Sequence, residues 1–315
     1  RLQAQLFRNG RKPSGNVRRP LRGNGSAHRA VCSAEYTMRC EPAKKIFAMI
    51  KHRLSLNCVI LKNRHNISCV ISCVFIRKEN MLNIKHLTKT YGSKKAVDDL
   101  SLHIAPGEIY GFIGHNGAGK TTTLKSCVGI LQFDAGEILV NGTSVRKDPL
   151  TCKKLIAYIP DNPDMYEFMT GIKYLNFIAD IFGIGAEERV QRINKYADMF
   201  ELTASLAQPV SSYSHGMKQK LAVIAAWIHS PKLIIMDEPF VGLDPKAAHT
   251  LKGLMRAVCN DGGAIFFSTH VLEVAEKLCD KVAIIKGGRL IRSGTMDEVK
   301  GDESLESVFL ELEAE

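Results

Sequence analysis

An eight-residue loop is the feature that most constrains what this chain can fold into. Residues 114–121 read Gly-His-Asn-Gly-Ala-Gly-Lys-Thr, which matches the phosphate-binding pattern G-x-x-x-x-G-K-[ST] at every fixed position. The preceding run, residues 108–113, is apolar and β-prone, and residues 121–130 have helical spacing with no glycine before position 129. This loop, a P-loop, is therefore predicted to join a strand to a helix, which is the context that the motif requires.

The chemistry of the loop follows from its residue types. Gly114, Gly117 and Gly119 let the backbone turn with its N–H groups inward, and these groups form an anion cradle with the helix N-terminus. Lys120 can reach the β- and γ-phosphates of a nucleotide, and Thr121 can offer its hydroxyl to Mg²⁺. The predicted cofactor-binding residues of this segment are Gly114, His115, Asn116, Gly117, Ala118, Gly119, Lys120, Thr121 and Thr122.

A pair of carboxylates follows further along the chain. Residues 232–239 read Lys-Leu-Ile-Ile-Met-Asp-Glu-Pro, and the apolar run 233–236 is predicted to be a central parallel strand buried on both faces. Asp237 ends this run, where a carboxylate beside a P-loop can hold Mg²⁺. Glu238 follows, where a second carboxylate can orient or deprotonate an attacking water.

A helix start lies between these two motifs. Residues 212–220 read Ser-Tyr-Ser-His-Gly-Met-Lys-Gln-Lys. Ser214 is predicted to be the N-cap of a helix that extends to Ile228, with Gly216 in its first turn. A helix N-terminus with a free hydroxyl can be a second anion site, and an ordinary capped helix is the alternative.

The charge of the chain is unevenly distributed. The formal net charge is +11, but residues 1–80 carry 17 of the 43 lysines and arginines and only 3 of the 32 acidic residues. Their net charge is therefore +14, which leaves −3 for residues 81–315. Because the positive excess lies outside the region with fold-like patterning, it gives no argument for a nucleic acid partner.

Residues 1–80 also differ from the rest in pattern. They show no sustained period of 2 or 3.6, whereas alternation typical of a strand begins at Met81. Their most apolar stretch, residues 67–76, has about half of the ~20 residues that a membrane span needs. Two interpretations stay open: translated upstream sequence before a native start at Met81, or a disordered basic arm that binds membrane or nucleic acid. In both, residues 81–315 form the folded domain.

The apolar pattern of that domain indicates its fold class. Four apolar runs with helices between them predict an α/β protein with a mostly parallel sheet; they are residues 109–113, 155–159, 233–236 and 264–267. The alternating segments 82–88 and 96–104 predict an antiparallel β-subdomain. Residues from about 163 to 227 are mostly helical in pattern, with helices expected at 171–182 and 186–200 and from Ser214 onward.

With these motifs in this order, the chain resembles the ATP-binding cassette (ABC) family, the ATPase subunits of ABC transporters. The resemblance extends from Met81 to about the C-terminus. It rests on the P-loop at 114–121, the signature at 213–217, the carboxylate motif at 233–238, the D-loop at 241–245 and the Phe-Ser-Thr-His segment at 267–270. It implies a P-loop NTPase core with a mostly parallel sheet, an N-terminal antiparallel β-subdomain and an inserted helical subdomain at about 163–227.

The resemblance also implies roles for individual residues, with ATP and Mg²⁺ as cofactors. Lys120, Glu238 and His270 are the implied catalytic residues: Glu238 positions water, and His270 senses or stabilises the γ-phosphate. Tyr91, in the segment Lys-Thr-Tyr-Gly, is implied to stack on adenine.

The same resemblance implies a head-to-tail homodimer. It would enclose two ATP molecules, each between the P-loop of one subunit and Ser214 and Gly216 of the other. Closure of this dimer depends on the γ-phosphate of ATP, which supplies contacts that ADP lacks.

Two positions depart from the usual pattern of the family. The signature Leu-Ser-Gly-Gly-Gln is replaced by Tyr-Ser-His-Gly-Met at 213–217, which keeps the serine and the second glycine. Asp161, which follows the strand 155–159, stands where the family usually has the glutamine of the Q-loop. A carboxylate can meet Mg²⁺ or its waters, so Asp161 joins Thr121 and Asp237 as a predicted metal ligand. Both variants resemble cassettes that pair with separate export-type membrane subunits.

The expected function is therefore ATP hydrolysis coupled to transmembrane transport, by the ATP-binding subunit of an exporter that drives a separate permease. Its expected location is peripheral, on the cytoplasmic face of the cell membrane. A soluble ABC ATPase with a regulatory, translation or repair role is the alternative. A nucleotide-binding module without turnover is a third interpretation, against which the intact Glu238 and His270 argue.

A short apolar segment is the expected contact with the permease. Residues 162–170 contain Met165, Tyr166, Phe168 and Met169, and an apolar, methionine-containing patch on such a subunit indicates a docking surface. Burial of this segment in the chain's own core is the other interpretation.

Overall fold

The computed structural model of the chain describes residues 33–37, 59–63, 66–72 and 80–314. The chain divides into two compact units, Arg1–Ile76 and Arg77–Glu315. In the first unit the described residues form an antiparallel sheet of order β1-β3-β2; the strands are β1 (Ser33–Thr37), β2 (Val59–Asn63) and β3 (Asn66–Ser72). Most of residues 1–80 lie outside the described residues, so both interpretations of this segment stay predictions.

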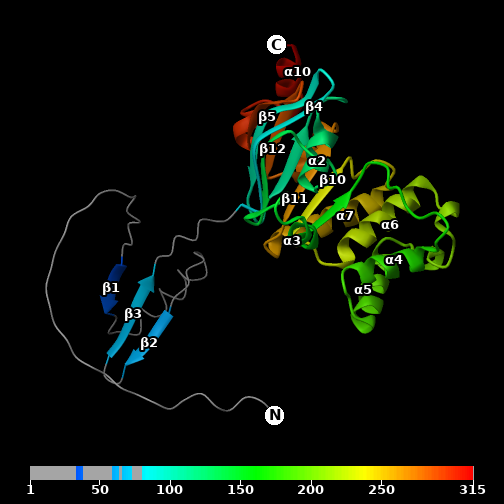
Figure 1. The fold of residues 1–315 in the computed structure, drawn as a ribbon, viewed down its shortest axis with the longest axis horizontal. Coiled ribbons are helices and arrows are strands. Elements are labelled where there is room, and N and C mark those ends of the chain that lie inside the picture. The colour runs from blue at the N-terminus through cyan, green and yellow to red at the C-terminus, as the bar shows by residue number, and fades with distance from the viewer. Residues whose placement is uncertain (1–32, 38–58, 64–65, 73–79, 315) are drawn as a thin grey trace. The chain divides into compact units, whose positions relative to one another are not determined.

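A six-stranded, mostly parallel sheet forms the centre of the second unit (Figure 1). Its order is β13-β12-β6-β11-β10-β9, and within it only the edge strand β13 runs antiparallel to its neighbour. The strands are β6 (Ile109–Ile113), β9 (Ile156–Ile159), β10 (Leu233–Asp237), β11 (Ala264–Thr269), β12 (Lys281–Lys286) and β13 (Arg289–Thr295). The four predicted apolar runs are thus confirmed as strands of one parallel sheet.

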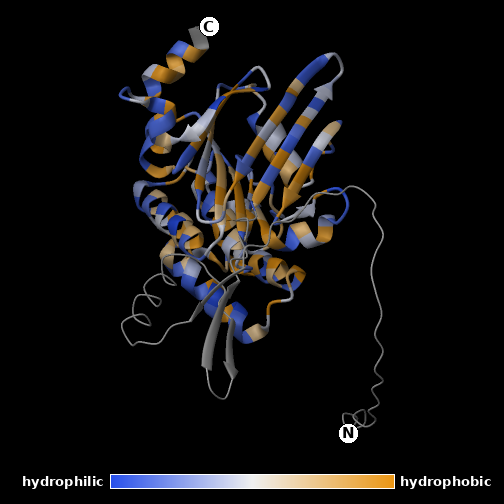
Figure 2. Ribbon diagram, turned by 90° about the vertical axis from the view of Figure 1, so that its left-hand side faces the viewer, coloured by the Kyte–Doolittle hydropathy of each residue, from blue (hydrophilic) through white to orange (hydrophobic). Residues whose placement is uncertain are grey.

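A second sheet of the same unit is antiparallel, with order β5-β4-β7-β8. Its strands are β4 (Leu82–Tyr91), β5 (Lys94–Ile104), β7 (Ala135–Val140) and β8 (Thr143–Ser144). Along β5, Leu100 and Leu102 are buried whereas Ser101 and His103 are exposed, and Figure 2 shows such alternation as blue and orange bands along the long strands. This period of two is what the sequence predicts for a sheet with one buried face.

The predicted helical subdomain is present and gathers at one end of the unit (Figure 1). It contains α4 (Gly171–Ile181), α5 (Ala186–Met199) and α6 (His215–Ile228). The remaining α-helices described are α2 (Lys120–Cys127), α3 (Pro149–Leu155), α7 (Pro245–Asn260), α8 (Leu272–Leu278), α9 (Met296–Lys300) and α10 (Leu305–Ala314).

The parallel sheet is buried on both faces, because alternate residues of each strand enter different hydrophobic clusters. Ile234 and Met236 of β10 pack in the cluster that contains residues of α4 to α8. Leu233 and Ile235 pack in the cluster formed with α2 and the antiparallel sheet. The unit is therefore layered, with the parallel sheet between two apolar cores.

Within the described part of the chain, none of the helices has both the length and the apolar composition that crossing a membrane requires.

Two glycine-to-alanine substitutions test this packing in opposite directions. Gly253→Ala should raise the free energy of unfolding by about 0.5–1 kcal/mol, because Gly253 is exposed inside α7 and a β-carbon there meets nothing within 4 Å. Gly111→Ala should lower it by about 1–3 kcal/mol, because its β-carbon would lie 2.7 Å from Sγ of Cys279. Urea unfolding followed by circular dichroism measures both free energies. A loss of stability in Gly253→Ala would contradict the placement of Gly253 at an exposed position inside helix α7.

Candidate functional site

The carboxyl ends of four neighbouring strands bring the predicted residues together. β6 leads into the P-loop at Gly114, β9 leads to Asp161, β10 ends at Asp237, and β11 leads to His270. Because β6, β11, β10 and β9 are consecutive in the sheet, these four segments meet at one edge of it. The register places Asp237 directly beside Ser268.

The P-loop lies so close to neighbouring backbone that two of its glycines are required. Gly119, the N-cap of α2, has φ 108°, and a β-carbon there would lie 2.3 Å from the carbonyl oxygen of Ala96. At Gly114 a β-carbon would lie 2.4 Å from the carbonyl oxygen of Ile285. The motif's glycines thus allow a path that no other residue could follow.

The ammonium group of Lys120 is buried beneath the loop. Its Nζ donates to the carbonyl oxygens of Gly114 at 2.5 Å and His115 at 3.3 Å, and it lies 3.8 Å from Oε1 of Glu238. Burial lowers the pKa of Lys120, while the negative charges of Glu238 and Asp237 act in the opposite direction. A cation held beside loop carbonyls at a helix N-terminus is well placed to pair with phosphate oxygens.

The carboxylate of Asp237 connects the P-loop helix to strand β11. Oγ1 of Thr121 donates to Oδ2 of Asp237 at 2.6 Å, and Oγ of Ser268 donates to Oδ1 at 2.5 Å. Asp237 is only 3% exposed, so both of its oxygens are fixed in direction. The hydroxyl of Thr121 and the carboxylate of Asp237 are hard oxygen donors side by side, which fits a Mg²⁺ ion shared with a nucleotide.

The next residue, Glu238, has a strained backbone that turns its carboxylate toward the P-loop. Its φ is 47°, in the left-handed region, which costs on the order of 1 kcal/mol or more for a residue other than glycine. The backbone N–H of Glu238 donates to the hydroxyl of Ser268 at 3.1 Å. Its Oε2 lies 2.9 Å from Nδ1 of His270, whereas its Oε1 is buried and has no hydrogen-bond partner among the described residues.

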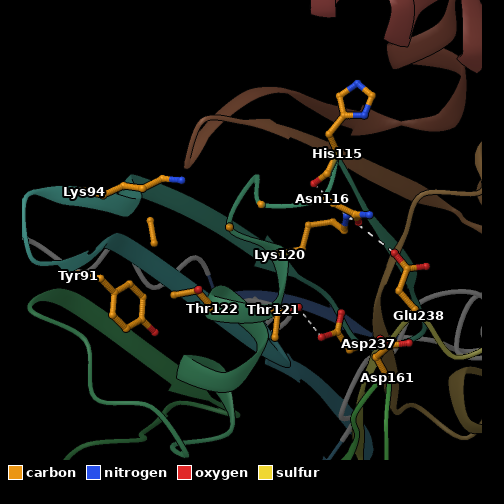
Figure 3. Close-up of a pocket in the computed structure, with 13 residues that line it drawn as sticks. Tyr91, Lys94, His115, Asn116, Lys120, Thr121, Thr122, Asp161, Asp237 and Glu238 are labelled. Carbon is orange, nitrogen blue, oxygen red and sulfur yellow. Dashed lines mark hydrogen bonds and ion pairs between the residues drawn. The ribbon is translucent and has the colours of Figure 1, made fainter.

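A cavity of about 330 Å³ opens in front of these groups (Figure 3). In Figure 3, Tyr91 lies at one end of it and Glu238 and Asp161 lie at the other, with Lys120 and Thr121 between. The cavity is lined by Tyr91, Lys94, Ala96, His115, Asn116, Gly117, Gly119, Lys120, Thr121, Thr122, Asp161, Asp237 and Glu238. An elongated site with an aromatic ring at one end and an anion cradle at the other suits a nucleoside polyphosphate.

Asp161 shares this cavity with Asp237. It is exposed in the loop that follows β9. Burial raises the pKa of Tyr158 above its ordinary value, and the charges of Asp237 and Asp161 contribute to the same shift, so both carboxylates lie within electrostatic reach of one phenol. The structure thus places Asp161 in the predicted cavity beside Asp237, and its role as a metal ligand stays a prediction.

Ser214 and Gly216 are not among the residues that line the cavity. Ser214 caps α6 by accepting a hydrogen bond from the backbone N–H of Met217 at 3.3 Å, as predicted. A β-carbon at Gly216 would lie 2.7 Å from the carbonyl oxygen of Gly242, so the helix start packs against the D-loop. One chain therefore does not bring the signature and the P-loop into one pocket.

Sequence reasoning missed three residues of the site. Lys94 and Ala96 line the cavity from β5, and only the pairing of β4 with β5, which places Lys94 opposite Tyr91, indicates this. Ser268 bridges Asp237 and Glu238. Its position beside a predicted parallel strand that ends in a carboxylate is the signal that could have found it.

Segment 162–170 is buried in one part and exposed in another, and its predicted contact with a permease stays a prediction. Met165 is 7% exposed and belongs to the core cluster, whereas Phe168 is 81% exposed and Tyr166 is 49% exposed. A larger apolar groove, about 690 Å³, lies elsewhere, and Tyr158, Phe182 and His229 are among its lining residues. Three apolar side chains along it are strongly exposed: Ile130, Leu150 and Ile181.

Comparison with known proteins gives concordant matches. A family model described as "ABC transporter" matches residues 97–241. The chain is 34% identical over 237 residues to the uncharacterized ABC transporter ATP-binding protein YhcH of Bacillus subtilis (strain 168), a match that covers 75% of this chain and 76% of the relative. It is 33% identical over 241 residues to the ABC-type transporter ATP-binding protein EcsA of the same organism, which covers 75% and 98%.

Solved structures of ABC cassettes also superimpose on this chain. A protein described as the ATP binding subunit of an ABC transporter superimposes with a TM-score of 0.71 at 34% identity, covering 74% of this chain and 99% of that one. The cassette MJ0796, in a dimeric, post-hydrolysis state bound to ADP and Pi, superimposes with a TM-score of 0.64 at 24% identity, covering 69% and 99%; this second likeness concerns the fold alone.

Removal of the Ser268 hydroxyl should destabilise the site. Ser268→Ala leaves one oxygen of the buried Asp237 without its hydroxyl partner, and the N–H of Glu238 keeps only its 3.3 Å hydrogen bond to the carbonyl oxygen of residue 268. The free energy of unfolding should therefore fall by about 1–3 kcal/mol. Thr250→Ala, which removes an exposed hydroxyl bonded to the carbonyl oxygen of Lys246, should change it by less than about 0.5 kcal/mol. Guanidinium unfolding of both variants measures this, and equal effects would show that Ser268 has no special role.

Proposed function

Because this chain belongs to the family of ABC transporter ATP-binding proteins, we propose that it hydrolyses ATP to drive a separate transmembrane permease, as the subunit of an exporter. The observation that carries the catalytic part of this proposal is the carboxylate of Glu238. Its Oε1 is buried 3.8 Å from Nζ of Lys120 and has no hydrogen-bond partner among the described residues, while its Oε2 is held by His270.

The cavity supports ATP as the nucleotide. Lys120 and the N-terminus of α2 provide positive charge where the β- and γ-phosphates of ATP would lie. Tyr91, which is about half exposed at the far end of the cavity, provides a flat face on which adenine can stack. The residues between them, from Gly114 to Thr122, supply the backbone N–H groups of the cradle.

The oxygen donors support Mg²⁺ as the metal. The hydroxyl of Thr121 and the carboxylate of Asp237, which are 2.6 Å apart, would hold it, and Asp161 on the neighbouring loop would meet it directly or through water. The chemistry that Mg²⁺ supplies when bound is neutralisation of the charge on the phosphates. Ser268 keeps Asp237 oriented for this task.

Glu238 is the proposed general base. A water that enters beside Oε1 can give its proton to this oxygen as it attacks the γ-phosphate. His270 fixes the other oxygen, because its Nδ1 lies 2.9 Å from Oε2 of Glu238. The ring of His270 is 54% exposed in one chain, which leaves it able to reach a phosphate oxygen as well.

A second copy of the chain is the proposed partner for nucleotide binding. Ser214 and Gly216 lie outside the cavity that contains their own P-loop, so they are free to complete the site of another subunit in a head-to-tail sandwich. The neighbouring cassette described as dimeric with ADP and Pi is a protein in which two such subunits assemble. ATP would favour closure because its γ-phosphate adds contacts that ADP lacks.

The apolar groove along α3 and α4 is the proposed docking site of the permease. Its exposed residues Ile130, Leu150 and Ile181 can bury an apolar helix face, and Lys153 and Lys154 at its rim can pair with acidic residues. Phe168 and Tyr166, which are also exposed but do not line this groove, would make a separate contact with the permease. Docking would hold the subunit on the cytoplasmic face of the membrane.

Glu238→Gln tests the catalytic proposal. The variant should retain ATP binding, lose at least about 100-fold in kcat, and accumulate as an ATP-bound dimer, because the amide keeps the shape of the side chain but cannot accept the proton. Phosphate release and size-exclusion chromatography with ATP measure these effects. Glu137→Gln, at an exposed pair with Lys85, is the control with unchanged turnover, and near-normal turnover in Glu238→Gln would remove Glu238 from the role of base.

Leu150→Glu tests the permease contact. In its own cell the wild-type chain should sediment with the membrane fraction, and Leu150→Glu should move most of it to the supernatant, because a charge in the groove opposes burial. Val190→Glu places the same charge on α5, at a residue that is 58% exposed and outside the groove, and should leave sedimentation unchanged. Wild-type protein found only in the supernatant would favour the soluble ABC ATPase instead.

A further inference from the structure

The C-terminal helix α10 has a contact with the nucleotide cradle that the family motifs do not include. Its apolar residues Leu305, Val308, Phe309 and Leu312 recur at helical spacing and are all buried, while Glu306, Leu310 and Glu311 are exposed. The helix is capped at its start, where the N–H of Ser307 donates to Oγ of Ser304 at 3.1 Å. It therefore packs as an amphipathic helix on the body of the unit.

Helix α10 contacts residues at and beside the P-loop in two ways. The ring of Phe309 lies 5.0 Å from the ring of His115, centroid to centroid, at an interplanar angle of 58°. Nζ of Lys286, at the end of β12, donates to the carbonyl oxygen of Leu312 at 3.1 Å, where a cation suits the C-terminal turn of a helix. Lys286 and the P-loop residues His115 and Ala118 also line one small hollow.

The backbone of His115 contacts the proposed catalytic residue Lys120. Its carbonyl oxygen accepts hydrogen bonds from Nζ of Lys120 at 3.3 Å and from the N–H of Ala118 at 3.1 Å. Its imidazole points the other way, out of the loop and away from Lys120, as Figure 3 shows. His115 therefore contacts α10 with its ring and the ammonium group of Lys120 with its backbone carbonyl oxygen.

We infer that Phe309 of α10 is a positioning residue for the nucleotide cradle, acting through the ring of His115. The inference rests on the proposed ATP site. The tip of the P-loop is exposed, and at Gly117, with φ 84°, a β-carbon would meet nothing within 4 Å. A side-chain anchor beside such a tip reduces the conformational freedom that phosphate binding must remove, so nucleotide binds more tightly to the anchored loop.

The experiment measures ATP and ADP affinity in the full chain. His115→Ala and Phe309→Leu should each raise the Kd for both nucleotides by about three- to tenfold, and the double variant should be no weaker than either single one, because both remove the same contact. His115→Phe keeps an aromatic ring against Phe309 and should restore near-wild-type affinity. For Phe309→Leu, whose side chain does not line the nucleotide cavity, kcat at saturating ATP should stay within about twofold of wild type, since the loop is reordered once nucleotide is bound.

A control separates positioning from loss of packing. Val308→Ala removes buried apolar volume from the same helix without touching the ring contact, so it should lower the melting temperature and leave both Kd values unchanged. His115 is exposed, so His115→Ala should keep the wild-type melting temperature. Unchanged Kd in His115→Ala, or multiplied effects in the double variant, would overturn the inference while leaving the ATP site intact. Absence of ATP binding by the wild-type chain would instead overturn the proposed function.

Discussion

The carboxylate of Asp237 is the group on which the geometry of the site depends. It is buried at the end of a fully buried strand and accepts hydrogen bonds from Thr121 on one side and Ser268 on the other. A buried charge is tolerated only when such partners are present. These two hydroxyls come from α2 and β11, so the same bonds that satisfy the charge also fix the P-loop helix and the neighbouring strand in register.

This constraint also explains why a strained backbone is kept at the next residue. Ser268 uses its hydroxyl twice, donating to Asp237 and accepting from the N–H of Glu238. With its amide held, Glu238 adopts φ 47°, and its side chain reaches both Lys120 and His270. The strain thus directs a carboxylate into the cavity, and the hydrogen bonds around Asp237 stabilise the turn that contains it.

Much of the fold and most of the site could be predicted from the sequence. Runs of apolar residues indicate which strands are buried, and the positions of glycines indicate where the backbone turns. The runs that form β6, β10 and β11 are apolar since both sheet faces are covered, and the P-loop glycines are required by close backbone contacts at Gly114 and Gly119. The sheet order and the contact of Phe309 with His115 depend on segments distant in sequence, which no local period records. The same holds for Ser268, a small residue whose importance comes only from the strand beside it.

Segment 238–244 links the carboxylate of the chain's own cavity to the start of α6, which lies outside that cavity. The N–H of Val241 donates to the carbonyl oxygen of Glu238 at 3.2 Å, and Gly216 packs against Gly242 so closely that a β-carbon would lie 2.7 Å from its oxygen. One turn further along α6, Nζ of Lys220 lies 2.6 Å from Oδ2 of Asp244. Because Glu238 is its first residue and both Gly242 and Asp244 contact α6, a displacement of this segment would move Glu238 together with the helix start that carries Ser214. The Glu238 side of the cavity and the start of α6, which lie in different places on the chain, are therefore connected through the D-loop.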